Sequence, residues 1–407
     1  MRQFVFDIEA NGLNPDKVWC ICMRELGTNN KYTINQSGVE IGRFNQFLEE
    51  QGECELIGHN IIDYDIPVLE RLLGADFSKC KITDTLVMSR LANPQREGGH
   101  SLENWGNILG QPKGEHSDWD NFSQDMVDYC SQDVAVNVLA YKRLLTELDG
   151  FGSESIDLEH RVQSIISQQI KAGWKLDQEK AFLLLAELKE KKYDLEDEVL
   201  QTFKPLPTFV KEITPKIKKD GTHSVVGLKF LGEQWTTVVA PFSRLDYPVF
   251  NLGSRQQIGR YLQYFGWKPK QFTETGQPIV DEAVLSKVEG IPQASLIGEY
   301  LMIQKRVAQV QSWLDAVKDD GRVHGYVNAC GAVTGRMTHS SPNMGQVPAV
   351  YSPYGKQCRD VWTVPEGYKL VGCDASGLEL RMLAHYMNDE DYTNEMLNGD
   401  IHTANQL

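Results

Sequence analysis

An apolar segment at the start of the chain narrows the choice of folds more than any other. Phe4–Phe6 leads directly into Asp7 and Glu9, and a second apolar run at residues 18–22 follows a turn rich in Gly, Asn and Pro. This pattern predicts two strands. Because residues i and i+2 of a strand project from the same face, we expect both carboxylates to point one way.

Strand and helix patterns alternate through the rest of the front third. Residues 43–51 and 65–73 have the apolar spacing of helices, and a short buried strand is expected at 55–58 between them. Such alternation predicts a mixed α/β layer over residues 1–150. A Gly- and Ser-rich stretch at 149–155 is interpreted as a linker.

Length and charge support a chain of several domains with one acidic region. The chain has 407 residues, more than one core normally fills, so two or three domains are expected. Its net charge is −15, and residues 1–150 hold 24 acidic but only 13 basic side chains. The acid excess therefore lies where carboxylates could hold metal ions. The negative net charge does not exclude a nucleic-acid partner, because affinity for nucleic acid depends on local basic stripes rather than on total charge.

The sequence indicates a protein of a reducing cytoplasm. No apolar run is long enough to span a bilayer, and the start lacks a secretory signal pattern. Eight cysteines occur without a Cys-x-x-Cys pair, which disfavours both a disulfide scaffold and structural zinc.

The remainder of the chain is expected to be mainly helical. Residues 156–203 have a long charged helical pattern, and helices resume at 254–265 and 297–317. The stretch 204–249 interrupts them with several prolines and lysines and is interpreted as a basic, irregular excursion. Residues 369–374 are predicted to form a buried strand.

Two further motifs add acidic groups to Asp7 and Glu9. Asp65 follows an apolar strand at the start of a helix, where the helix dipole favours a carboxylate; the plain alternative is a helix cap. Tyr129 and Asp133 lie four residues apart and share one helix face; alone they could be an ordinary surface pair.

In this order and spacing, the three motifs resemble the proofreading 3′→5′ exonuclease family with four acidic ligands and a tyrosine. The resemblance implies a ribonuclease H-like fold and two divalent ions, Mg²⁺ or Mn²⁺. It also implies that Tyr129 orients the attacking water. The implied metal ligands are Asp7, Glu9, Asp65 and Asp133. The segment Asp84-Thr85-Leu86 resembles a structural stretch of the same family.

Residues 369–381 (KLVGCDASGLELR) resemble the first palm motif of family A DNA polymerases. The resemblance implies that Asp374 binds the polymerase metals, assisted by the carbonyl of Ala375. It implies that Glu379 narrows the sugar pocket against ribose. The apolar side chains of the helix expected at 377–388, Leu380, Leu383 and Met387 among them, should be exposed and available to a partner surface.

A second stretch, residues 334–346, resembles the segment of that family that contacts the primer–template. Its polar side chains could bind phosphates or the minor-groove acceptors that every base pair presents alike. The implied DNA-binding residues are Arg336, His339, Asn343 and Gln346, with Lys305 and Arg306 on a basic helix.

The resemblance covers almost the whole chain and is strongest to the family A polymerases of T-seven-like podophages. It implies an exonuclease domain at 1–150, a helical thumb at 151–320 with a tip at 204–249, and a partial palm with the start of the fingers at 321–407. In that group the thumb tip binds host thioredoxin. Thioredoxin is therefore a candidate partner here, although the tip is shorter; a simple DNA-contacting tip is the alternative.

The last residues, 400–407, resemble the opening of the fingers, where His402 would contact the incoming triphosphate. We expect the remaining fingers and the second palm carboxylate to lie on another polypeptide. Either the gene is split between two polypeptides or the chain is a shortened one. In both cases this chain alone should not polymerise.

The predicted function is metal-dependent 3′→5′ proofreading within a DNA-directed DNA polymerase of family A acting on a primer–template. Two alternatives are a non-catalytic primer–template binding subunit and an RNA-processing exonuclease of the same fold. The intact acidic motifs disfavour the first alternative, and the palm motif disfavours the second.

Overall fold

A computed structural model describes residues 1–35, 42–112, 114, 116–224, 228–229, 231–232 and 240–399. The chain forms two compact units, Met1–Trp362 and Thr363–Leu407. Within the described ranges, no helix is both long and apolar enough to cross a membrane.

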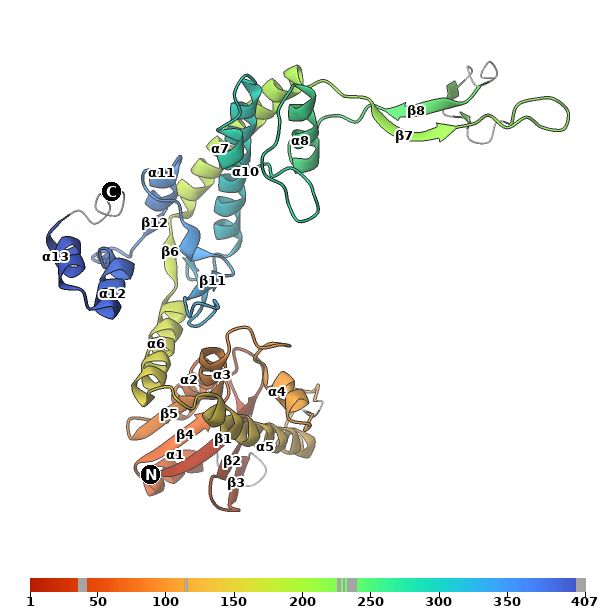
Figure 1. The fold of residues 1–407 in the computed structure, drawn as a ribbon. Coiled ribbons are helices and arrows are strands. Elements are labelled where there is room, and N and C mark those ends of the chain that lie inside the picture. The colour runs from red at the N-terminus through yellow and green to blue at the C-terminus, as the bar shows by residue number, and fades with distance from the viewer. Residues whose placement is uncertain are drawn as a thin grey trace. The chain divides into compact units, whose positions relative to one another are not determined.

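The front of the first unit is a mixed five-stranded sheet (Figure 1), with the strand order β3-β2-β1-β4-β5. The central strand β1 is antiparallel to β2 and parallel to β4, so both of its edges are paired. The strands are β1 (Arg2–Ala10), β2 (Val18–Glu25), β3 (Lys31–Asn35), β4 (Cys54–Gly58) and β5 (Cys80–Asp84).

Helices cover both faces of this sheet because side chains alternate along β1. Phe4 and Phe6 belong to one fully buried core and Val5 to the other. On the first face lie α1 (Arg43–Gln51) and α2 (Asp65–Leu73). On the second lie α3 (Thr85–Ala92), α4 (Leu102–Ile108) and α5 (Gln124–Glu147). The predicted mixed α/β architecture, both helices and the strands are confirmed.

The predicted linker is shorter than expected. The helix α6 (Ser153–Ala172) begins inside it, after Gly152 in an extended conformation. Four further helices follow: α7 (Gln178–Thr202), α8 (Arg255–Tyr264), α9 (Glu282–Leu285) and α10 (Gln293–Asp315). They share another apolar core, separate from the two that flank the sheet, in which α7 and α10 pack side by side (Figure 1). The helical predictions for these segments are confirmed except at residues 173–177, where the strand β6 (Trp174–Leu176) interrupts the pattern; the ends of the helices differ by a few residues.

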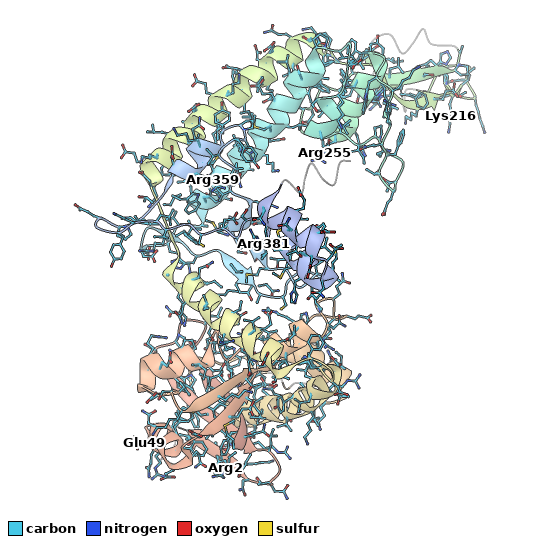
Figure 2. The ribbon with its side chains drawn as sticks, turned by 60° about the vertical axis from the view of Figure 1, so that its left-hand side comes forward. Arg2, Glu49, Lys216, Arg255, Arg359 and Arg381 are labelled. Atoms are coloured by element: carbon cyan, nitrogen blue, oxygen red, sulfur yellow. The ribbon has the colours of Figure 1, made fainter. Side chains whose placement is uncertain are left out.

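The prediction of a wholly irregular segment at 204–249 is wrong in part. Strands β7 (Thr208–Ile213) and β8 (Phe242–Asp246) pair in an antiparallel ribbon. These strands contain β-forming residues, but the prolines and lysines nearby in the sequence masked that strand signal. Figure 2 shows Lys216 on this segment, beyond β7.

Short elements complete the first unit. Strand β6 (Trp174–Leu176) pairs with β9 (Arg322–Val323), and β10 (Tyr326–Asn328) pairs with β11 (Thr338–Ser340). The others are η2 (Met344–Gln346), α11 (Gly355–Asp360) and β12 (Trp362–Thr363), which ends at the boundary of the two units.

The second unit contains α12 (Leu378–Met387) and α13 (Glu390–Asn398). The predicted strand at 369–374 does not form, and Leu370 and Val371 are 64% and 86% exposed. A strand needs a neighbour to pair its backbone, and the described residues of this unit contain no other strand beyond Thr363. Leu383 and Met387 are exposed as predicted, whereas Leu380 is half-buried.

Candidate active site in the front sheet

The first two carboxylates lie on the face of β1 that α5 covers. Asp7 is half-buried and Glu9 is 7% exposed. Both line a cavity of about 360 Å³ at the end of the sheet. Their common direction follows from strand alternation, as the sequence predicted.

Asp65 is tied directly to that strand. It is the first residue of α2, and its Oδ1 accepts a hydrogen bond of 3.2 Å from the backbone N–H of Ile8. Tyr64, not Asp65, occupies the cap position, and it makes no side-chain cap bond. The helix-cap alternative is therefore wrong. Burial raises the pKa of the Asp65 carboxyl to about 7, because water no longer solvates the charged form.

A buried carboxylate, Asp84, fixes the loop that leads to Asp65. Its oxygens accept hydrogen bonds from the backbone N–H groups of Asn60 (2.8 Å), Ile62 (3.0 Å) and Leu86 (2.9 Å). Helix α6 adds a further support, since Nε2 of His160 accepts from the backbone N–H of Asp84 at 2.8 Å. These bonds give the segment beginning at Asp84 a structural role beside the acidic motifs.

Helix α5 supplies the remaining two predicted residues. It begins at Gln124, five residues before Tyr129, and the hydroxyl of Ser123 caps it by accepting from the N–H of Met126. Asp133 is 3% exposed. Both Tyr129 and Asp133 line the cavity with Asp7, Glu9 and Asp65, so the structure brings all five predicted residues together.

Aromatic side chains that the sequence analysis missed also shape the cavity. The ring of Trp119 packs edge-on against Tyr129 at 5.7 Å between centroids, and His116 lies 5.9 Å from Tyr129. The hydroxyl of Tyr64 donates to the carbonyl of Gly12 at 2.6 Å and joins two cavity loops. The available signal was an isolated aromatic residue, Trp119, in a polar stretch ten residues before Tyr129.

The donor set suits hard divalent cations. Carboxylate oxygens are the ligands that Mg²⁺ and Mn²⁺ prefer, and three of the four carboxylates are almost fully buried. Among the described residues that line the cavity, none is Lys or Arg. Burying several negative charges together is costly unless a cation offsets them. The residues present therefore fit the predicted ions.

The predicted primer–template residues lie on and after the β10–β11 hairpin. Arg336 and Gln346 are exposed, and His339 is half-buried on β11. The side chain of Asn343 accepts from the N–H of Gly345 at 3.1 Å and caps η2, so its oxygen already serves the local fold.

The two basic residues of α10 have different surroundings. Lys305 is exposed and lines a groove of about 700 Å³ together with Arg255, which Figure 2 labels on α8. Arg306 is only 9% exposed, and its Nε donates to the carbonyl of Pro353 at 3.3 Å. In this structure Arg306 therefore supports the fold rather than a surface.

The predicted nucleotide-addition residues belong to the second unit. Asp374 and Ala375 are exposed in the irregular stretch before α12, and Glu379 lies in the first turn of that helix. Asp374 therefore does not stand at the end of a buried strand, contrary to the prediction. His402 lies outside the described residues.

Comparisons with known proteins give consistent matches. A family model described as DNA polymerase family A matches residues 230–406. The DNA-directed DNA polymerases of Escherichia phage T7 and Enterobacteria phage T3 are each 33% identical over 99% of this chain and 72% of their own length. Among solved structures, the polymerase domain of Pol1 from M. smegmatis, in a complex with DNA primer-template and dNTP, aligns with a TM-score of 0.66 and 18% identity. That alignment covers 96% of this chain and 59% of the Pol1 chain, and at this identity it establishes the fold alone.

Proposed function

The chain belongs to DNA polymerase family A, and on that premise we propose that its front sheet removes nucleotides from the 3′ end of DNA. The observation that carries the proposal is the convergence of four carboxylates and one tyrosine on a single cavity. Hydrolysis of a phosphodiester with two metal ions requires such a convergence.

Each residue has a role in this mechanism. Asp7, Glu9, Asp65 and Asp133 would hold the two ions, which when bound neutralise the charge of the scissile phosphate and lower the pKa of water. The phenol of Tyr129 orients the attacking water by hydrogen bonding, which requires its hydroxyl within reach of the reacting phosphate.

Trp119 offers a flat apolar face beside this chemistry. It is half-buried, lines the same cavity, and is anchored because its carbonyl accepts from Nε1 of Trp19 at 2.9 Å. Bases of single-stranded DNA stack on aromatic side chains without sequence preference. We assign Trp119 as a platform for the nucleotide about to be removed. A mispaired primer end frays at a lower cost, so it would occupy this cavity more often.

The polymerase-related residues complete the proposal. Arg336, His339, Gln346 and Lys305 would contact the primer–template, and Asp374 with Glu379 would take part in nucleotide addition. The division into exonuclease, thumb and palm at 150 and 320 is part of the same proposal. Binding of a second polypeptide and binding of thioredoxin both stay predictions. Co-purification of either partner with a tagged form of this chain would test them.

The test uses the purified chain, Mg²⁺ and a 3′-recessed, end-labelled primer–template, with and without nucleotides. Stepwise shortening of the primer is the expected result. A variant with Asp7 and Glu9 replaced by Ala should lose this activity. Glu49→Gln, an exposed carboxylate on α1 (Figure 2), is the matched control and should keep it. Absence of shortening would favour a DNA-binding role without nuclease activity, and extension with nucleotides would show that the chain polymerises alone.

A further inference from the structure

Three cysteines lie on the same sheet face as the catalytic carboxylates. In the antiparallel pairing of β1 and β2, Cys22 is opposite Asp7 and Cys20 is opposite Glu9. Directly opposite residues of an antiparallel pair project to the same face. The two thiols of β2 are therefore neighbours of the proposed metal-binding carboxylates.

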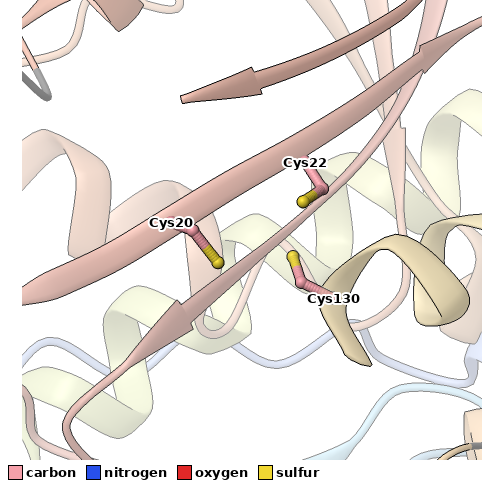
Figure 3. Close-up of side chains that lie close together, drawn as sticks. All are labelled: Cys20, Cys22 and Cys130. Carbon is pink, nitrogen blue, oxygen red and sulfur yellow. The ribbon is translucent and has the colours of Figure 1, made fainter. Parts of the chain in front are cut away.

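Helix α5 brings the third thiol, Cys130, onto this pair. The sulfur atoms of Cys20, Cys22 and Cys130 all lie within 4.8 Å of one another, and Figure 3 shows the three side chains pointing toward a common centre. All three residues are buried, with at most 2% of their surface exposed. Zn–S bonds of about 2.3 Å place the thiolates of one ion roughly 3.8 Å apart, so a small contraction would suffice.

A carboxylate lies beside one of the three thiols. The sulfur of Cys130 lies 3.4 Å from the carbonyl oxygen of Asp7 and 3.7 Å from its Oδ2. Cys130 also forms a second close group with Asp7 and Glu9, whose ligand atoms lie within 4.8 Å of one another. Cys130 thus belongs both to the sulfur cluster and to a close group with two carboxylates that line the cavity.

We propose that Cys20, Cys22 and Cys130 form a binding site for a thiophilic divalent cation of the Zn²⁺ and Cd²⁺ class, and that the carboxylate of Asp7, which lies beside Cys130, turns toward the ion as the fourth ligand. Four such donors match the tetrahedral coordination of these ions. Each thiol releases its proton to solvent when the ion binds. The cysteine pattern that disfavoured structural zinc took account only of sequence neighbours, whereas β1–β2 pairing and α5 bring this group together from distant residues.

The site has a regulatory consequence, which rests on the proposed exonuclease function. An ion that recruits Asp7 withdraws one ligand from the carboxylate cavity, so a thiophilic cation should inhibit the nuclease. Mg²⁺ prefers oxygen ligands and does not compete for the sulfur cluster. The carboxylate site therefore selects hard ions and the sulfur site selects soft ions, and both use Asp7 as a ligand.

Cd²⁺ is the probe for binding. The reduced full-length chain in excess Mg²⁺ is titrated with Cd²⁺ while the ultraviolet sulfur-to-cadmium charge-transfer band is recorded. We expect one tightly bound equivalent, and native mass spectrometry should show loss of three thiol protons. Cys22→Ser and Cys20→Ser should each weaken binding at least about tenfold. The control Cys373→Ser, at an exposed thiol, should bind as the wild type does.

Two results would overturn the site: no thiolate band at one equivalent of Cd²⁺, or the same band in Cys22→Ser. The first would leave the three cysteines as small apolar core residues. Because the mass measurement uses the wild-type chain, it decides the matter even where a serine variant fails to fold.

The nuclease assay tests the coupling separately. One equivalent of Cd²⁺ should slow primer shortening at least about tenfold in the wild type and in Cys373→Ser but not in Cys22→Ser. Tight Cd²⁺ binding without inhibition would keep the sulfur site and refute the recruitment of Asp7. A chain that binds Cd²⁺ but never shortens DNA would refute the exonuclease proposal and leave the sulfur site standing.

Discussion

The two regions that carry acidic motifs after apolar segments have different fates in the structure. Asp7 follows Phe4–Phe6 on β1, whose two edges are paired by β2 and β4, and the carboxylate is fixed at a cavity. Asp374 follows residues 369–373, which have no strand partner in the part of the chain that the structure describes, and the carboxylate is exposed. A motif thus becomes a structured site only where backbone pairing holds its segment in place.

The largest expected effect is a difference in nuclease activity between substitutions of Asp133, in the front cavity, and of Asp374, in the second unit. Asp133→Asn should reduce primer shortening at least about a hundredfold, since loss of even an outer-shell partner of a metal ligand costs roughly 10–100-fold. Asp374→Asn should leave the shortening rate within about twofold of the wild type, because Asp374 does not line the front cavity. Single-turnover rates on labelled DNA measure both, and equal losses would contradict the separation.

The same contrast applies to stability. Leu56→Ala removes a fully buried side chain of β4 and should lower the free energy of unfolding by about 2–5 kcal/mol. Leu370→Ala, at a 64% exposed position, should change it by about 0.5 kcal/mol or less. Denaturant unfolding followed by tryptophan fluorescence checks the pair. A large loss at Leu370 would mean that its segment is buried in solution.

Asp65 connects activity to stability through pH. Its pKa is raised from about 3.9 in an unfolded chain to about 7 in the fold. The protonated carboxyl therefore favours the fold below about pH 4, and this contribution is lost as the pH rises through 7. At pH 8 without divalent cations, Asp65→Asn should be more stable than the wild type by on the order of 1–3 kcal/mol, while lacking nuclease activity.

Thermal unfolding at pH 8 and pH 4 measures this difference, which should shrink at the lower pH. Added Mg²⁺ should stabilise the wild type more than Asp65→Asn. A variant that is less stable than the wild type at pH 8 would show that the buried charge is offset by the protein itself.

The smallest expected effect concerns Trp119. Trp119→Ala should raise KM for single-stranded DNA about tenfold, since stacking of one base contributes roughly 1–3 kcal/mol. Trp119→Phe keeps a flat ring and should restore most of the affinity. If both variants bind DNA as the wild type does, the stacking role is wrong.

Two pairs of the proposed site residues could be predicted to share a face because their spacing is local, whereas only the resemblance joined the three motifs. Strand alternation placed Asp7 with Glu9, and one helical turn placed Tyr129 with Asp133. Asp84 ends strand β5, and only the resemblance singled out its segment. Trp119 lies in a loop whose course is set by distant contacts, so no periodicity revealed its role. The cysteine cluster was missed for the same reason, since Cys130 approaches Cys20 only through the packing of α5 on the sheet.

The support that α6 gives to the front sheet limits how freely the proposed nuclease could be exchanged between polymerases. His160 holds the backbone of Asp84, and Gln163 donates two 3.0 Å hydrogen bonds to the carboxylate of Asp63, just before Asp65. A transplant that stopped at residue 150 would leave Asp84 and Asp63 without these hydrogen bonds. Any exchange of this region would therefore have to carry α6 (Ser153–Ala172) with it.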